Sequence, residues 1–201
     1  MIGQPIPVVI TNGPAGATGP TGAAGANGLI TNQGFASGNY YVYPHIAQGQ
    51  AVMTEDVTNY MAIYIPASTS FDRIACRTGA GFSGTASVRL GIYNNSGGKP
   101  TTVVLDAGLV SCTAASTTYE ITISQTLAEG WYWLAFNSQT NATTNNFVTA
   151  NTTISNSLFS LSSSALTMQS RWVQTGVTGA FNTAGTLSVN TGSPIVGMRA
   201  A

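Results

Sequence analysis

The side chains that could perform acid–base catalysis are few and scattered in this 201-residue chain. It has six acidic residues and one histidine, His45. A glycosidase needs two carboxylates roughly 5–9.5 Å apart across a sugar. Glu55 and Asp56 are neighbours, so in a strand they would point to opposite faces. Asp106 lies in the turn-like run VLDAG, which we expect it to order, and no G-x-S-x-G motif accompanies His45. We therefore predict that the chain is not an enzyme.

The sequence also has no motif typical of a metal site or of a disulfide framework. The two cysteines, Cys76 and Cys112, belong to no CxxC pair, and a structural zinc needs about four nitrogen or sulfur ligands. No calcium-loop motif is present, so we expect no metal and no cofactor. Both cysteines lie in strand-like runs, and we expect two buried thiols, with a disulfide as the alternative. Residues 1–5 show no export signal, which favours a reducing compartment.

Aromatic rings are the candidates for sugar contact, because a ring face can cover the apolar side of a pyranose. Trp131 and Trp133 lie two residues apart in a strand-like run and should share one face, with Tyr132 on the other. We expect two of these three rings in the core and Tyr132 to be the exposed one. Arg171 and Trp172 are the other candidate glycan contacts.

Composition limits the partners of this chain. Its six basic and six acidic residues make up 6% of the sequence and cancel, so phosphate neutralisation cannot drive binding to nucleic acid. Hydrophobic residues form 43% of the chain, which argues against disorder, and no apolar run is long enough to insert into a membrane. A polar, uncharged surface suits hydrogen bonding to neutral groups such as sugars.

Glycine recurs at every third position between residues 13 and 28. This phase is the requirement of a collagen triple helix, in which only glycine fits at the crowded axis. Sixteen residues would give a rod about 50 Å long, whereas a flexible linker would explain the glycines but not their phase. The triple helix predicts a homotrimer. Its axial residues would be Gly13, Gly16, Gly19, Gly22, Gly25 and Gly28.

The segments on either side of this stalk have different characters. Residues 1–12 are apolar and extended around two prolines, and we expect them to be an attachment segment that docks on another protein. Residues 29–58 contain a cluster of tyrosines (Tyr40, Tyr41 and Tyr43), which is a candidate trimer contact and an alternative sugar contact. The attachment side chains are Ile6, Val8, Val9 and Ile10.

Residues 29–201 read as one all-β domain. Short runs with period-two alternation and β-branched residues are separated by turn residues, and no stretch has helical periodicity with caps. This pattern predicts an antiparallel β-sandwich or jelly roll. We expect residues 138–157 to form a long surface loop with an edge strand at 147–150. The other predicted strands are 60–65, 71–77, 85–93, 102–105, 109–112, 119–123, 131–137, 158–161, 171–174, 186–189 and 195–199.

Two runs carry a family resemblance: GIYNNSGGKPTTVVLDAG at 91–108 and EITISQTLAEGWYWLAF at 120–136. They are similar to β-sandwich domains of tailed-phage virion proteins, especially tail-fibre and receptor-binding proteins. The resemblance covers about residues 57–138 and transfers no functional residue. Phage fibres also commonly carry short collagen-like stalks, so the two signals agree. Residues 139–201 resemble no family.

The resemblance implies a structural protein on the virion surface, assembled in the host cytoplasm. The first expectation is a trimeric tail fibre whose distal sandwich binds the host, through a bacterial surface glycan. Its N-terminal segment would attach to the baseplate or tail. The alternative is a head fibre or capsid decoration protein, with the same segment anchored to the major capsid protein. A non-viral collagen-like surface protein is a third reading.

Overall fold

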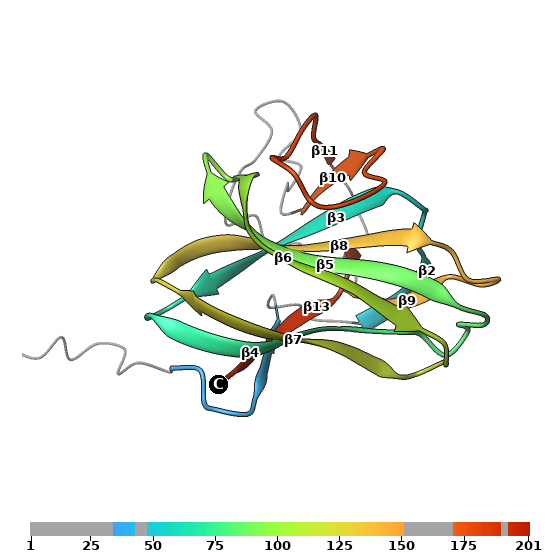
Figure 1. The fold of residues 1–201 in the computed structure, drawn as a ribbon, viewed down its shortest axis with the longest axis horizontal. Helices are drawn as coiled ribbons and strands as arrows, with labels where there is room; N and C mark the ends of the chain where they lie inside the picture. The colour runs from blue at the N-terminus through green and yellow to red at the C-terminus, as the bar shows by residue number, and fades with distance from the viewer. Residues whose placement is uncertain (1–33, 43–47, 151–170, 190–192) are drawn as a thin grey trace, which may run out of the picture. The chain divides into compact units, whose positions relative to one another are not determined.

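The computed structural model describes residues 34–42, 48–150, 171–189 and 193–201. Within these ranges the chain is all β, with antiparallel sheets packed as a sandwich and no helix (Figure 1). These residues accordingly contain no helix long and apolar enough to cross a membrane. The predicted attachment segment, the stalk, His45 and the strand at 158–161 lie outside the described residues.

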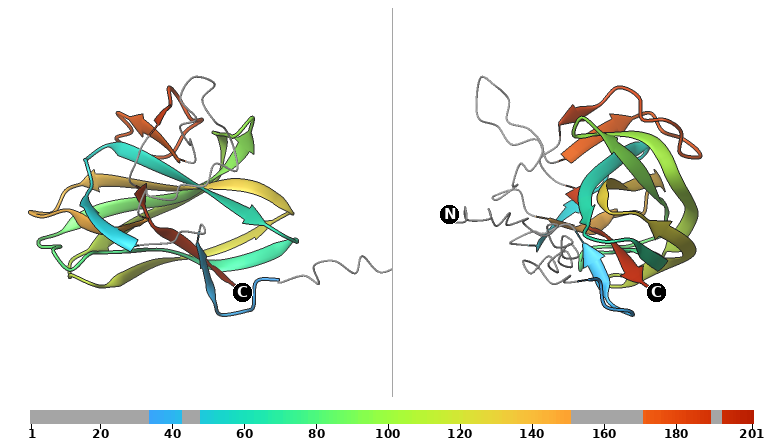
Figure 2. Two further views of the ribbon diagram at one scale, coloured as in Figure 1. Left: turned by 180° about the vertical axis from the view of Figure 1, so that it is seen from behind. Right: turned by 90° about the vertical axis from the view of Figure 1, so that its left-hand side faces the viewer.

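The sandwich has two main layers and a smaller third sheet, as the views from behind and from the side also show (Figure 2). The six-stranded sheet has the order β11 (Ser188–Val189), β10 (Arg171–Thr175), β3 (Val57–Ile65), β8 (Gly130–Thr140), β5 (Ala86–Ser96), β6 (Lys99–Cys112). The four-stranded sheet has the order β1 (Tyr40–Val42), β13 (Val196–Ala200), β4 (Thr69–Arg77), β7 (Thr118–Leu127). The small sheet has the order β12 (Ser193–Pro194), β9 (Asn146–Ala150), β2 (Gln48–Val52).

The hairpin between β5 and β6 follows directly from its turn residues. Gly97 and Gly98 both have positive φ, 57° and 75°, as a two-residue turn that matches strand twist requires. The predicted strands 102–105 and 109–112 are one strand, β6. Leu90 pairs with Gly108 and Gly91 pairs with Asp106, so one residue of β6 is left over and forms a bulge. The sequence pattern suggested the end of a strand at this bulge.

The main core lies between the two large sheets. Its side chains come from both sheets, and those of β5 alternate at positions 86, 88, 90 and 92, as the period-two pattern predicted. Cys76 and Cys112 are both buried free thiols in this core. The neighbouring Cys112 thiol and, after it, burial raise the pKa of Cys76 well above its ordinary value. Cys76 therefore remains protonated, and both buried cysteines pack as small apolar residues.

The prediction of a surface loop over residues 138–157 is wrong for its described part. Residues 138–140 complete β8, and β9 is the central strand of the small sheet. Phe147 is fully buried, with its ring centroid 4.9 Å from that of Phe136. The buried Asn145 donates from Nδ2 to the Met53 carbonyl oxygen at 3.0 Å. Because buried donors need acceptors, this bond helps an Asn- and Thr-rich segment to be buried.

A second apolar cluster lies on the outer face of the six-stranded sheet. Residues 176–187, here called the cover, pack Val177, Phe181, Ala184 and Leu187 against that face. The buried rings beneath the cover come from four different strands and include Tyr60, Tyr93, Trp133 and Trp172. The six-stranded sheet is thus apolar on both faces, and the cover is a third layer that buries part of the outer one.

Asp106 ties the cover to the sheet. Arg89 Nη1 donates to both carboxylate oxygens of Asp106, at 2.9 and 2.8 Å. The same carboxylate accepts from the backbone nitrogens of Phe181 and Gly108, each at 3.0 Å. The expectation that Asp106 orders the VLDAG turn is confirmed by the bond to Gly108. The bond to Phe181, across the sheet surface, was not foreseen.

Ion pairs on the four-stranded sheet are more exposed. Arg199 Nε and Nη2 donate to the two oxygens of Asp72 at 2.9 and 2.7 Å. These hydrogen bonds hold the pKa of Asp72 below its ordinary value. Arg73 lies 3.8 Å from a Glu120 oxygen. Because exposed pairs contribute little to stability, these charges mainly keep this face soluble.

Gly91 should be intolerant of any side chain. A Cβ at this position would lie 2.6 Å from the Phe181 ring and 2.7 Å from the Leu105 carbonyl oxygen. We expect Gly91→Ala to lower the free energy of unfolding by about 1–3 kcal/mol, because the cover would be lifted from the sheet. Urea unfolding measures the change. Gly179→Ala is the control, since nothing lies within 4 Å of its Cβ. Equal midpoints for the two variants would contradict the packing described.

Asp106→Asn should loosen the cover, because it leaves Arg89 without its carboxylate and weakens the bond to Phe181. We expect a loss of about 2 kcal/mol in unfolding free energy. The cover should also become sensitive to limited proteolysis before the rest of the domain unfolds. Glu55→Gln, which alters an exposed carboxylate, is the control. A protease-resistant cover in Asp106→Asn would show that apolar packing alone holds it.

Candidate functional site

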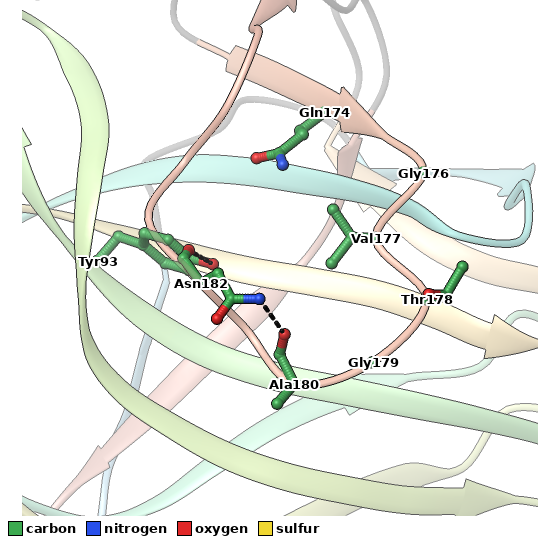
Figure 3. A pocket seen from close by; sticks show the side chains of 8 residues that line it. All are labelled: Tyr93, Gln174, Gly176, Val177, Thr178, Gly179, Ala180 and Asn182. Carbon is green, nitrogen blue, oxygen red and sulfur yellow. Dashed lines mark hydrogen bonds between the residues drawn. The ribbon is translucent and has the colours of Figure 1, made fainter.

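A pocket of about 290 Å³ lies between the cover and the six-stranded sheet (Figure 3). Its wall is the chain that leaves β10 and curves back over the sheet, and one ring from β5 closes its inner side. The lining contains no acidic and no basic side chain. It consists of Tyr93, Gln174, Gly176, Val177, Thr178, Gly179, Ala180 and Asn182.

The pocket wall takes its shape from a turn after β10. Gly176 has a φ of +76°, which a residue with a side chain adopts only with strain. Both backbone groups of Val177 are hydrogen-bonded. Its nitrogen donates to the Asp56 carbonyl at 3.0 Å, and its carbonyl accepts from Asn137 Nδ2 at 2.9 Å. Farther along, Gln139 Nε2 donates to the Gly179 carbonyl. The backbone of the wall is therefore held by one main-chain bond, to Asp56, and by two side-chain donors on β8, Asn137 and Gln139.

Two tyrosines of the sheet position the ends of the wall. Tyr93 Oη donates to the Asn182 carbonyl at 3.0 Å, and Tyr60 Oη donates to Gln174 Oε1 at the same distance. Gly185 nitrogen also donates to Gln174 Oε1. Burial raises the pKa of Tyr60 to about 12 and raises that of Tyr93 further. Both hydroxyls are protonated at neutral pH and serve as hydrogen-bond donors.

This arrangement suits recognition more than catalysis. The pocket offers amide, hydroxyl and backbone groups, which pair with neutral polar ligands, and none of them titrates near neutral pH. Nowhere in the described residues do three or more histidine, cysteine or carboxylate side chains gather into a metal-binding group. A sugar ring has the size and the hydroxyl groups that such a pocket accommodates.

The structure does not present Arg171 and Trp172 as glycan contacts. Their exposed fractions are 2% and 7%. Arg171 Nη1 donates to the Ala150 carbonyl at 3.1 Å. Trp172 Nε1 donates to the Gly98 carbonyl at 2.9 Å, and Lys99 Nζ lies 5.2 Å from the centre of its ring. Trp172 therefore packs against the β5–β6 hairpin. No sequence pattern predicts this contact between segments so far apart in the chain.

The alternation predicted along β8 is confirmed, but Tyr132 is not the exposed ring, because it is half-buried like Trp131. Tyr132 points between the sheets and packs against the main core, and Trp133 is fully buried on the outer face. Trp131, on the same face as Trp133, is only half-buried. It contacts Tyr64, which is 40% exposed and which sequence reasoning missed. Its position four residues after Tyr60 on the same strand face was the available signal.

The predicted trimer-contact segment is partly described. Tyr41 packs into the main core, with its ring centroid 3.9 Å from that of Phe35. Tyr40 is 38% exposed on β1, at the edge of the four-stranded sheet. Tyr40 and Val42 line an apolar hollow of about 210 Å³ on the outer side of that sheet. Tyr43 lies outside the described residues.

Comparisons with known proteins were made at three levels. No protein-family model matches the chain, no curated protein matches it, and no solved structure matches it. What the protein does must therefore be argued from its own residues. The features that bear on function are the uncharged pocket, the ring pair of Tyr64 and Trp131, and the phased glycines.

Proposed function

We propose that this chain is a homotrimeric fibre protein of a tailed-phage virion whose β-sandwich binds a bacterial surface glycan. The observation that carries the binding part is the uncharged, amide-lined pocket beneath the cover. Its groups can pair with sugar hydroxyls, and no charged group steers an ionic ligand into it. A single pocket of this size would bind one or two sugar rings weakly.

Trimer formation would convert this weak contact into firm attachment. Three copies on one stalk raise the effective concentration of the second and third contacts, and several fibres on a particle multiply the effect. The phased glycines from Gly13 to Gly28 support three chains, since a collagen helix is formed from three strands. The apolar hollow beside Tyr40 gives the domain a surface on which copies can meet.

A head fibre or capsid decoration protein is the second candidate. The apolar attachment residues Ile6, Val8, Val9 and Ile10 can dock as an extended strand on a capsid protein or on a baseplate protein. Both placements use the same stalk and the same outward domain. They differ in where on the particle the chain is found, which is directly measurable.

Labelled electron microscopy distinguishes these placements. Antibodies raised against residues 29–201 are bound to virions purified from the source and visualised with gold. We expect gold at the tail tip or baseplate. Gold distributed over the capsid would support the head-fibre alternative, with residues 1–12 as its anchor. Virions without label, alongside labelled free protein, would contradict both forms of the proposal.

The stalk can be tested on purified protein. We expect the full chain to have three times the monomer mass by light scattering and to show a collagen-like melting transition. Gly22→Val should abolish that transition and reduce the trimer mass, because a side chain does not fit at the triple-helix axis. Ala23→Val, one position along at a non-axial site, is the matched control. A trimer and a transition unchanged in Gly22→Val would exclude the triple helix.

A further inference from the structure

The outer face of the six-stranded sheet has a pair of aromatic rings in contact, of which Tyr64 is exposed and Trp131 is half-buried. Tyr64 on β3 and Trp131 on β8 are direct cross-strand partners. Their ring centroids are 5.0 Å apart, and the ring planes make an angle of 49°. Trp131 also packs partly against the apolar cluster beneath the cover. Two paired central strands therefore hold both rings in place before any ligand arrives.

Polar groups border this ring pair. Glu129, in the turn that precedes β8, is exposed, and its Oε1 accepts from Tyr64 Oη at 3.0 Å. On β5, Asn94 pairs with Tyr132 of β8. Asn95, the next residue of β5, therefore lies opposite Trp131 of the neighbouring strand. Its Oδ1 accepts from Trp133 Nε1 at 2.9 Å, so the amide nitrogen points away from that bond and can donate elsewhere.

We propose that Tyr64 and Trp131, bordered by Glu129 and Asn95, form a contact site for a neutral pyranose residue. This inference rests on the proposed glycan-binding function and names its ligand class. The ring faces would cover the C–H side of the sugar. The free oxygen of the Glu129 carboxylate would accept from a sugar hydroxyl, and the Asn95 amide would donate to one.

The charge at the border selects among sugars. Among the described residues, no cationic side chain lies within salt-bridge distance of Glu129. Its carboxylate would repel a uronic acid, a sialic acid or a phosphate-bearing polymer while accepting from neutral hexoses. The site shares no residue with the pocket beneath the cover, so variants can separate the two.

Tryptophan fluorescence and a glycan array test the site on the full chain. The probes are oligosaccharides of neutral hexoses and N-acetylhexosamines, with uronic acid oligomers as the acidic comparison. Trp131 is the one half-buried tryptophan of the three, so sugar binding should change the emission of the wild type and not that of Trp131→Phe. We expect Tyr64→Ala and Trp131→Ala each to weaken neutral-sugar binding about tenfold or more, by roughly 1.4 kcal/mol.

Three further variants define the outcome. Leu109→Ala removes an exposed apolar side chain elsewhere, 52% exposed on β6, and should leave binding unchanged. Thr178→Ala alters the pocket and reports on sugar held there, whereas the change in Trp131 emission on sugar binding should persist. Glu129→Gln should narrow the preference for neutral over acidic sugars. If Trp131→Ala fails to fold, Trp131→Phe and Tyr64→Ala still report on the ring pair.

The results separate this inference from the function on which it rests. Neutral-sugar binding that is lost in Thr178→Ala but kept in Tyr64→Ala and Trp131→Ala would overturn the ring-pair site and leave glycan binding in place. A preference for acidic sugars would overturn the ligand class. Failure of every sugar to bind the wild type would overturn both the site and the glycan-binding function.

Discussion

The structure depends on the need to bury the outer face of the six-stranded sheet. The strands β3, β5 and β8 carry large rings on that face, in addition to apolar side chains on the face that meets the second sheet. A two-layer sandwich would leave Tyr60, Tyr93 and Trp133 in water, at a cost of the order of 2 kcal/mol for each ring. The cover removes that cost and encloses a pocket between itself and the sheet.

The cover itself has few contacts that a sequence pattern would reveal. Its apolar residues are separated by glycine, threonine and asparagine, so it has no strand or helix of its own to stabilise it. Two contacts with the sheet set its position. The Phe181 ring packs where Gly91 has no side chain, and the Phe181 backbone nitrogen donates to the Asp106 carboxylate. The charged group therefore has a structural role in a protein with few charges.

The sequence was sufficient for the all-β sandwich and for most of its long strands, because period-two alternation, clearest in residues 86–92 of β5, reflects a buried face directly. It was insufficient where burial is not periodic. The strand β9 is buried although it carries asparagine and threonine, and β3 is buried on both faces. The candidate site was harder still. Trp131 and Tyr132 are both half-buried, and Trp131 packs against a cluster that includes Phe181, which lies far from β8 in the sequence.

The strand order of the four-stranded sheet has a consequence for biosynthesis. β13, the last strand along the chain, inserts between β1 and β4, two of the first strands. During translation this sheet therefore cannot close until residues 196–200 have left the ribosome. The phased glycines emerge much earlier. If three chains assemble as we propose, their N-terminal segments could meet while the domains are still unclosed, and assembly would then either wait for release or tolerate incomplete sandwiches.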